Sequence, residues 1–182
     1  MGAPQVTKDQ LSDALRKSLG RVELVAFDFD GVFTDNLVIV SEDGTESVAC
    51  SRGDGFGVQA LRDAGVGLVV LSTETNPVVG ARCRKLGLEC VQGLDDKAAA
   101  LREQIVARGT TPDRTAFLGN DVNDIGCMSA VGVAVGVADS HDAVLPYVSF
   151  LTSKRGGFGA VREFCDLVIA CREAAKGDGE RG

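Results

Sequence analysis

Four short apolar runs, separated by helical patterns, constrain the fold of this chain more than any other feature. The first run, Val22 to Phe29, is almost uninterrupted, which is typical of a parallel strand buried on both faces. Similar runs recur at Val66 to Leu71, Thr115 to Leu118 and Val131 to Val137. Helical patterns fall at about residues 56–64, 76–86, 96–108 and 122–130. This alternation predicts an α/β fold built on a doubly wound parallel sheet.

The two ends of the chain and one insertion complete the predicted organisation. Apolar residues at helical spacing predict a leading helix within residues 1–20. Residues 21–172 form the predicted core, which a β-hairpin with an Asp43-Gly44 turn interrupts at about 37–51. The hairpin is too short to be a cap domain. Residues 173–182 are rich in glycine and charge and are expected to form a flexible tail.

Composition limits the classes of partner. The 182 residues, 45% hydrophobic and 25% charged, fit one ordinary globular domain. A formal net charge of -7 argues against nucleic-acid and anionic-membrane partners. The N-terminal residues are polar and the apolar runs are too short to span a bilayer, so neither a targeting segment nor a membrane span is expected. Six cysteines without C-x-x-C spacing favour reduced core residues and a cytoplasmic location.

Polar side chains follow the ends of the predicted strands. In an open parallel sheet, ligands bind at the carboxyl ends of the strands, near the point where the strand order reverses. The polar residues at such positions are Asp28, Asp30, Ser72, Lys97, Asn120, Asp121 and Asp124. We therefore expect them to meet in one site.

The chemistry of this cluster suits transfer of a phosphoryl group. Asp28 is the expected nucleophile, because an aspartate that forms an acyl phosphate splits one difficult displacement into two easier ones. Asp30 is expected to protonate the leaving oxygen and later to deprotonate water. Ser72 is expected to donate its hydroxyl to a phosphoryl oxygen and Lys97 to offset negative charge. The alternatives are an Asp28 that caps a turn, a Ser72 that caps a helix and a Lys97 on the surface.

Clustered carboxylates also predict a bound cation, because like charges held close together repel each other. Ligands that are all oxygen atoms favour Mg²⁺, which coordinates phosphate as well. The candidate ligands are Asp28, Asp30, Asn120, Asp121 and Asp124. Mg²⁺ there is expected to neutralise the phosphate and to hold it in line with the nucleophile.

Four motifs occur in a characteristic order. The D-x-D-G-x-x-T-D signature is Asp28 to Asp35, the second and third motifs are Ser72 and Lys97, and the fourth is Gly119 to Asp124. Together they resemble the haloacid dehalogenase superfamily of phosphatases, over the range from Val22 to about Ala170. The resemblance implies a Rossmann-like fold and a Mg²⁺-dependent phosphoric monoester hydrolase that works through an aspartyl phosphate.

Further segments, at Asp54 to Gly57, Gln92-Gly93, Ala138 to His141 and Gly156 to Glu163, resemble one capless branch of that superfamily. The branch includes 3-deoxy-manno-octulosonate 8-phosphate phosphatases, nonulosonate 9-phosphate phosphatases and the C-terminal domain of some acylneuraminate cytidylyltransferases. The resemblance implies a phosphate monoester of a 2-keto-3-deoxy sugar acid as substrate. It also implies a homotetramer in which hairpins form a central barrel and a neighbouring subunit covers each active site.

Substrate contacts are expected on both sides of the site. Glu74 resembles the sialic-acid side of the family, where octulosonate phosphatases have T-G-R, and it suits a hydroxyl or amine of the sugar. Arg82 is expected to reach a neighbour's site and bind the sugar carboxylate as a planar fork, with Lys85 as a further contact. For Arg82 and Lys85, a solvated helix face is an equally good interpretation.

The segment Gly53 to Gly57 is expected to form a turn whose backbone amides and Asp54 face the substrate. Gly55 belongs to this turn, and Ser51 and Arg52 beside it are expected to contact the sugar. The segment is not a nucleotide-binding loop, because it lacks G-x-G-x-x-G spacing after a strand.

Two residues depart from the family pattern. Asn120 stands where octulosonate phosphatases have a metal-binding aspartate, and Phe158 replaces an arginine of the G-G-R-G tail motif. Asn120 is shared with the cytidylyltransferase domains, which raises an alternative function: a catalytically weak or silent oligomerisation module associated with a sugar-acid cytidylyltransferase. A phosphosugar mutase is disfavoured, because it needs a sizeable cap over the intermediate.

Overall fold

A six-stranded, all-parallel sheet forms the centre of the molecule in the computed structural model, which describes residues 10–179. The strand order is β5-β4-β1-β6-β7-β8. The strands are β1 (Leu24–Phe27), β4 (Gly67–Leu71), β5 (Glu89–Val91), β6 (Thr115–Gly119), β7 (Val133–Gly136) and β8 (Phe150–Leu151). The order reverses at β1, between β4 and β6. The predicted doubly wound α/β fold is therefore confirmed.

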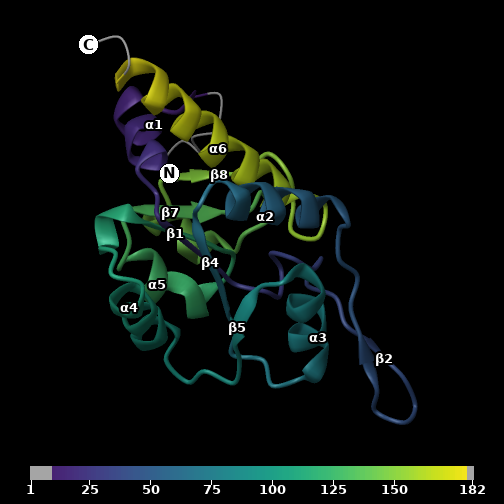
Figure 1. Cartoon of the computed structure of the whole chain (residues 1–182). Coiled ribbons are helices and arrows are strands. Elements are labelled where there is room, and N and C mark those ends of the chain that lie inside the picture. Colours follow the sequence, from purple (N-terminus) through teal and green to yellow (C-terminus); the bar gives the residue numbers. More distant parts are fainter. Residues whose placement is uncertain (1–9, 180–182) are drawn as a thin grey trace.

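Helices cover both faces of this sheet, as Figure 1 shows. The α-helices are α1 (Asp13–Gly20), α2 (Gly53–Asp63), α3 (Pro77–Leu86), α4 (Lys97–Ala107), α5 (Ile125–Met128) and α6 (Ala160–Gly179). The structure also describes the 3-10 helices η2 (Pro112–Arg114), η3 (Val122–Asp124) and η4 (Asp142–Tyr147). Among the described residues, no helix is long and apolar enough to cross a membrane.

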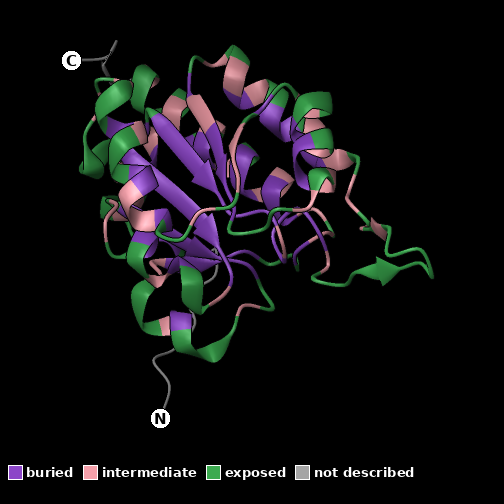
Figure 2. Ribbon diagram, turned by 90° about the horizontal axis from the view of Figure 1, so that it is seen from below, coloured by how far each residue is buried: buried purple, intermediate pink, exposed green. Residues whose placement is uncertain are grey.

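The strand β1 explains the two-layered core, because its side chains alternate between the faces. Val25 and Phe27 pack with α1, α2, α3 and α6, whereas Leu24 and Ala26 pack with α4 and α5. All four residues of β1 are fully buried. Figure 2 shows the buried strands at the centre and the exposed positions on the outer faces of the helices. Burial on both faces is the reason why the strand sequences are continuously apolar.

The predicted hairpin consists of β2 (Ile39–Val40) and β3 (Glu46–Ser47), which pair in antiparallel fashion. Gly44 adopts a φ of 82° in the connecting turn, a left-handed conformation that glycine tolerates best. The hairpin projects from the body of the molecule (Figure 1). Four consecutive apolar side chains, Leu37 to Val40, are more than half exposed on it.

Several predicted boundaries are wrong. The segment Gly53 to Gly57 is the first turn of α2 and not a loop, and the predicted helix 122–130 is split into η3 and α5. The chain is helical through Gly179, so the predicted tail does not begin at residue 173. Residues 1–9 of the predicted leading segment and residues 180–182 lie outside the described residues.

Candidate active site

The carboxyl ends of the central strands bring the predicted catalytic residues together. Asp28 follows β1 and donates its backbone N–H to the carbonyl oxygen of Leu118, 2.9 Å away in the neighbouring strand β6. Ser72 follows β4, and Asn120 follows β6. A cavity of about 260 Å³ opens here, and its lining residues are Asp28, Asp30, Asn36, Ser72, Thr73, Asn120, Asp121, Val122 and Asn123.

Lys97, the first residue of α4, forms two ion pairs behind this cavity. Its Nζ atom lies 2.6 Å from Oδ1 of Asp28 and 2.8 Å from Oδ1 of Asp124. Lys97 is 3% exposed and Asp124 fully buried. The other carboxylate oxygen of Asp124 accepts the backbone N–H groups of Asn120 (2.8 Å) and Asp121 (3.3 Å). Asp124 therefore fixes Lys97 and the loop after β6 in place.

Burial and the repulsion between Asp28 and Asp124 disfavour the ionised form of Asp28. Burial, and secondly the charge of Asp124, raise the pKa of Asp28 to about 7, although Lys97 acts in the opposite direction. Burial alone lowers the pKa of Lys97, but the two carboxylates outweigh it and the pKa is raised. One lysine thus faces two buried carboxylates, and the excess negative charge favours a further cation at the site.

The Asn120 side chain shows where such a cation fits. Its terminal amide group lies against two acceptors, the backbone carbonyl oxygen of Asp30 at 2.9 Å and Oδ2 of Asp28 at 3.2 Å. With the nitrogen turned toward them, the amide donates to both. With the oxygen turned toward them, three oxygen atoms converge, and an all-oxygen set that includes one carboxylate suits Mg²⁺.

The structure divides the five predicted metal ligands into two groups. Asp28, the backbone carbonyl of Asp30 and the terminal amide of Asn120 lie together, and they would offer three oxygens to a metal with the amide oxygen turned inward. Asp124 is engaged by Lys97, and Oδ1 of Asp121 accepts the backbone N–H of Val122 at 2.7 Å. Within residues 10–179, no three side chains of His, Cys, Asp or Glu converge in a way that could hold a metal. An oxygen set for a metal here would therefore include the amide or the backbone carbonyl as well as carboxylates.

Asp30 and Ser72 line the same cavity. The surroundings of Asp30 change its pKa, whereas those of Ser72 orient its hydroxyl. Burial, and secondly the charge of Glu74, raise the pKa of Asp30. A carboxyl with a raised pKa is suited to general acid catalysis. Ser72 is buried, and its hydroxyl oxygen accepts the backbone N–H of Glu74 at 3.0 Å, which leaves the hydroxyl proton for an oxygen in the cavity.

The loop after β1 is held by its own residues and by a distant segment. Gly31 has a φ of 78°, and its N–H donates to Oγ1 of Thr34 at 3.0 Å. A Cβ atom on Gly156 would lie only 1.8 Å from the carbonyl oxygen of Gly31. The N–H of Gly157 donates to the carbonyl oxygen of Val32 at 3.0 Å. The two consecutive glycines therefore allow the segment before α6 to pack directly on the catalytic loop.

The predicted substrate contacts fall into two cavities. Glu74 lines a cavity of about 320 Å³ that shares Asp30, Asn36 and Thr73 with the catalytic one. Arg52, Gly55, Arg82 and Lys85 line a separate cavity of about 660 Å³ together with Cys50, Phe56, Gln59 and Leu86. Ser51 accepts a hydrogen bond on its carbonyl oxygen from Nη2 of Arg82 at 2.8 Å. Within one subunit, these cations do not line the cavity of Asp28.

Asp54 does not face a substrate cavity, contrary to prediction. It is fully buried near the start of α2, and its Oδ1 accepts the backbone N–H of Arg162 in α6 at 3.0 Å. Burial raises the pKa of Asp54 to about 6, although the Arg162 hydrogen bond and the charge of Arg82 oppose the shift. Asp54 therefore links helix α2 to helix α6.

Sequence reasoning missed Asn36, Thr73, Val122 and Asn123 in the catalytic cavity and Glu46 in the adjoining one. Asn36 had one available signal, since it follows the first motif and asparagine tolerates the left-handed φ of 64° that it adopts.

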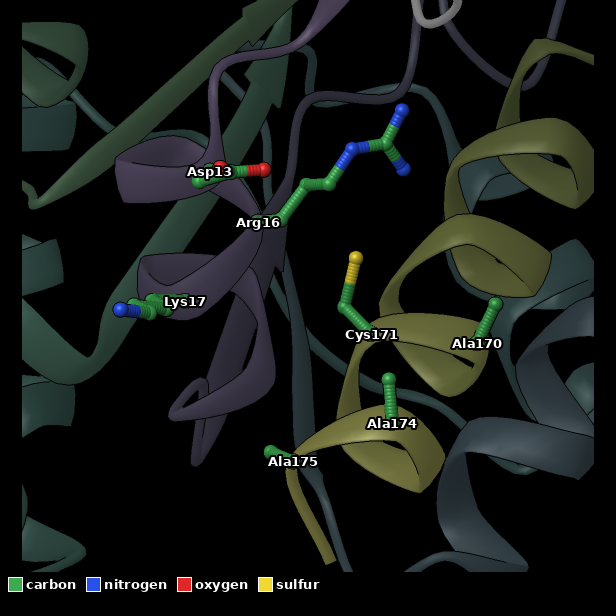
Figure 3. A pocket seen from close by; sticks show the side chains of 7 residues that line it. All are labelled: Asp13, Arg16, Lys17, Ala170, Cys171, Ala174 and Ala175. Carbon is green, nitrogen blue, oxygen red and sulfur yellow. The ribbon is translucent and has the colours of Figure 1, made fainter. Parts of the chain in front are cut away.

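A further groove lies between α1 and α6 and contains none of the predicted site residues. Figure 3 shows the Arg16 and Cys171 side chains directed into the space between these two helices. Its charged lining residues are Asp13, Arg16 and Lys17, and none of them lies in the buried carboxylate and lysine cluster, so the catalytic cavity is the candidate active site.

Comparison with known proteins identifies the family of the chain. No family model matches the chain. It is 30% identical over 168 residues to the 3-deoxy-D-manno-octulosonate 8-phosphate phosphatase KdsC of Yersinia pestis, covering 92% of this chain and 90% of that protein.

Two solved structures are similar as well. One, from Streptomyces avermitilis MA-4680 and provisionally assigned to the HAD family of hydrolases, has a TM-score of 0.80 and 43% identity, and covers 82% of this chain and 86% of that chain. The other is the 3-deoxy-D-manno-octulosonate 8-phosphate phosphatase of Moraxella catarrhalis in complex with a magnesium ion, a phosphate ion and a KDO molecule. It has a TM-score of 0.85 and 28% identity, and covers 92% of this chain and 99% of that chain. The chain belongs to the haloacid dehalogenase family of phosphoric monoester hydrolases, among the relatives of KdsC.

Proposed function

We propose that this phosphatase hydrolyses the phosphate monoester of a 2-keto-3-deoxy sugar acid, of the octulosonate 8-phosphate or nonulosonate 9-phosphate type. The observation that carries the proposal is the pairing of buried Asp28 with Lys97 at a cavity that also holds Asp30 and Ser72. The similarity to octulosonate 8-phosphate phosphatases supports the substrate class.

The first half of the reaction transfers the phosphoryl group to the protein. A carboxylate oxygen of Asp28 attacks phosphorus, and the bond between phosphorus and the sugar oxygen breaks. The electron pair leaves with the sugar oxygen, which takes the proton of Asp30. Lys97 holds Asp28 in position, and the Ser72 hydroxyl donates to a phosphoryl oxygen. The raised pKa of Asp30 supports its role as the acid.

The second half releases inorganic phosphate. Asp30, now ionised, takes a proton from water while the water oxygen attacks phosphorus. The bond between phosphorus and Asp28 breaks, and Asp28 regains its carboxylate. Asp28, the carbonyl oxygen of Asp30 and Asn120 would hold Mg²⁺. When bound, Mg²⁺ supplies charge neutralisation to the phosphate and to the buried carboxylates.

Substrate recognition extends beyond the catalytic cavity. Glu74 is proposed to accept hydrogen bonds from the sugar, because its cavity adjoins that of Asp28. Arg82, Lys85 and Arg52 are proposed to bind the sugar carboxylate in the active site of a neighbouring subunit, and Ser51 and Gly55 lie beside them. This arrangement requires a homotetramer, for which the exposed apolar hairpin is the supporting observation.

A second candidate function is a weakly active or silent oligomerisation module associated with a sugar-acid cytidylyltransferase. The amide of Asn120 favours it, because an amide gives the metal site one negative charge less than a carboxylate would. The resemblance to the C-terminal domain of acylneuraminate cytidylyltransferases remains a prediction of the sequence. A cytoplasmic location also remains a prediction, supported by six cysteines that are all free.

Release of phosphate tests the two functions against each other. The purified protein with Mg²⁺ is expected to release phosphate from a nonulosonate 9-phosphate and an octulosonate 8-phosphate. Both rates should fall to background after addition of a chelator and recover with excess Mg²⁺. A protein that binds a cytidylyltransferase but releases no phosphate, with or without metal, would support the silent module instead.

A further inference from the structure

A pocket with three carboxylates adjoins the catalytic cavity, and the hairpin segment contributes Leu37, Val38, Glu46 and Val48 to its lining. The pocket measures about 320 Å³, and Asp30, Asn36 and Thr73 belong to both cavities. Its carboxylates are those of Asp30, Glu46 and Glu74. No lysine, arginine or histidine occurs among the described residues that line it. A group bound beside the scissile phosphate therefore meets three carboxylates and no cationic side chain among the described lining residues of the same subunit.

Glu46 is fixed in this pocket by a hydrogen bond from Asn76, the residue that caps α3. Its Oε2 atom accepts a hydrogen bond from Nδ2 of Asn76 at 2.8 Å. Asn76 also caps α3, because its Oδ1 accepts the backbone N–H of Val78 at 3.0 Å. Glu46 is half-buried on β3. Asn76 thus joins the hairpin to α3. The second carboxylate oxygen of Glu46, Oε1, accepts no hydrogen bond from the described residues.

Glu74, which also lines the pocket, is held in a similar way. Its Oε1 accepts the backbone N–H groups of Thr75 (2.6 Å) and Asn76 (2.8 Å). One oxygen of each glutamate is therefore held by the protein, and one remains for a ligand. The charges of both glutamates act on Asp30, which places them within electrostatic reach of the general acid.

We propose that Glu46, together with Glu74, determines substrate specificity by selecting a hydroxylated chain next to the phosphate ester and rejecting a carboxylate there. The proposal rests on the proposed function and deepens it. Ionised carboxylates only accept hydrogen bonds, so they favour donors such as sugar hydroxyls and repel an anionic group. A sugar acid with phosphate and carboxylate at opposite ends meets this requirement, since its carboxylate then lies far from Glu46.

The test compares kcat/KM for three phosphate esters. D-sorbitol 6-phosphate presents hydroxyls beside the phosphate, 3-phosphoglycerate presents a carboxylate nearby, and p-nitrophenyl phosphate presents neither. In Glu46→Gln the side chain keeps its length and an oxygen for Asn76, but loses its charge. The ratio of kcat/KM for sorbitol 6-phosphate to that for p-nitrophenyl phosphate should fall about tenfold, mainly through KM. The ratio for 3-phosphoglycerate to p-nitrophenyl phosphate should rise.

Glu42→Gln is the matched control, because Glu42 is an exposed glutamate on the same hairpin that does not line the pocket. It should leave all three values unchanged. The proposal is overturned if Glu46→Gln changes all three esters by the same factor, which is the signature of a structural role, or if Glu42→Gln has the same effect as Glu46→Gln.

Binding to an inactive protein separates this proposal from the proposed function. Calorimetry of sorbitol 6-phosphate with Asp28→Asn in the presence of Mg²⁺ should show a Kd about tenfold lower than with the double variant Asp28→Asn and Glu46→Gln. Equal affinities, or no binding to either protein, would overturn the role of Glu46. Binding that depends on Glu46, in a wild-type protein that releases no phosphate, would sustain it while the proposed hydrolysis fails.

Discussion

The Nζ atom of Lys97 lies 2.6 Å from Oδ1 of Asp28, and both side chains are almost completely removed from water. These residues stand 69 positions apart in the sequence and come from α4 and from the end of β1. A buried charge that loses its partner is strongly destabilised. Both the activity of the protein and its folding stability are therefore expected to depend on this ion pair.

Lys97→Met should damage activity and stability together. The substitution leaves Asp28 and Asp124 facing each other without a cation, so the rate of phosphate release should fall roughly 100- to 1,000-fold. The free energy of unfolding should fall by about 3 kcal/mol or more. Kinetics and urea denaturation measure the two effects. Lys17→Met, at an exposed position on α1, is the control and should change neither. An active, equally stable Lys97→Met protein would contradict this account.

Asn120→Asp should strengthen metal binding. The new carboxylate would face Asp28 and the Asp30 carbonyl oxygen, and added ligand charge favours Mg²⁺. Titration calorimetry should show a Kd for Mg²⁺ lower by about tenfold. Asn123→Asp adds the same charge at an exposed position on the rim of the cavity and should have a much smaller effect. If both variants bind Mg²⁺ with equal affinity, Asn120 is not a ligand.

Asp54→Asn should change how stability depends on pH. Burial raises the pKa of Asp54 in the folded state to about 6, so the folded protein keeps this proton at a pH where the unfolded chain has released it. Wild-type stability therefore loses a contribution as the pH rises from about 4 to 6, worth roughly 2 to 3 kcal/mol. Asp54→Asn lacks this loss, so its stability relative to wild type should increase across that range.

Urea denaturation at pH 4.5 and pH 7 measures that difference. Asp63→Asn, exposed on the same helix, is the control and should change stability by less than about 0.5 kcal/mol at either pH. A difference between Asp54→Asn and wild type that is the same at both pH values would show that Asp54 does not titrate differently in the folded state.

Ile39→Glu should dissociate the proposed tetramer. Ile39 is 66% exposed in the hairpin, and a charge buried between hairpins would be costly. Light scattering should give a tetramer for wild type and a smaller species for Ile39→Glu, with loss of activity on sugar-acid phosphates. Ser41→Glu, in the hairpin turn, should remain tetrameric. A monomeric wild-type protein would remove the basis for substrate contacts from a neighbouring subunit.

The sequence was sufficient to predict the central strands and the catalytic cluster. Asp28, Ser72 and Asn120 follow strands that are buried on both faces, and parallel strands place their carboxyl ends together. Chain order and apolar pattern therefore predict the meeting of residues that are far apart in the sequence. The strands β5 and β8 were missed because a run of two or three residues has no measurable period.

Other features depend on contacts that no local pattern encodes. Asp54 was expected to face the substrate because glycines suggested a turn, but these glycines begin α2 and allow it to approach α6 closely: a Cβ on Gly57 would lie 2.9 Å from that of Cys165. Glu46 lines the acidic pocket and is held there by a hydrogen bond from Asn76, 30 positions away in the sequence. Asp124 stays a predicted metal ligand, and its contact with Lys97 is a role that no local pattern predicts.

Phosphate release by wild type and by Asp28→Asn, with Mg²⁺ and a nonulosonate 9-phosphate or an octulosonate 8-phosphate, tests the central claim most directly. The account predicts metal-dependent release by wild type and none above background by Asp28→Asn, whose amide cannot form the acyl phosphate. Circular dichroism should confirm that the variant is folded. A folded Asp28→Asn protein that releases phosphate as fast as wild type would contradict the account.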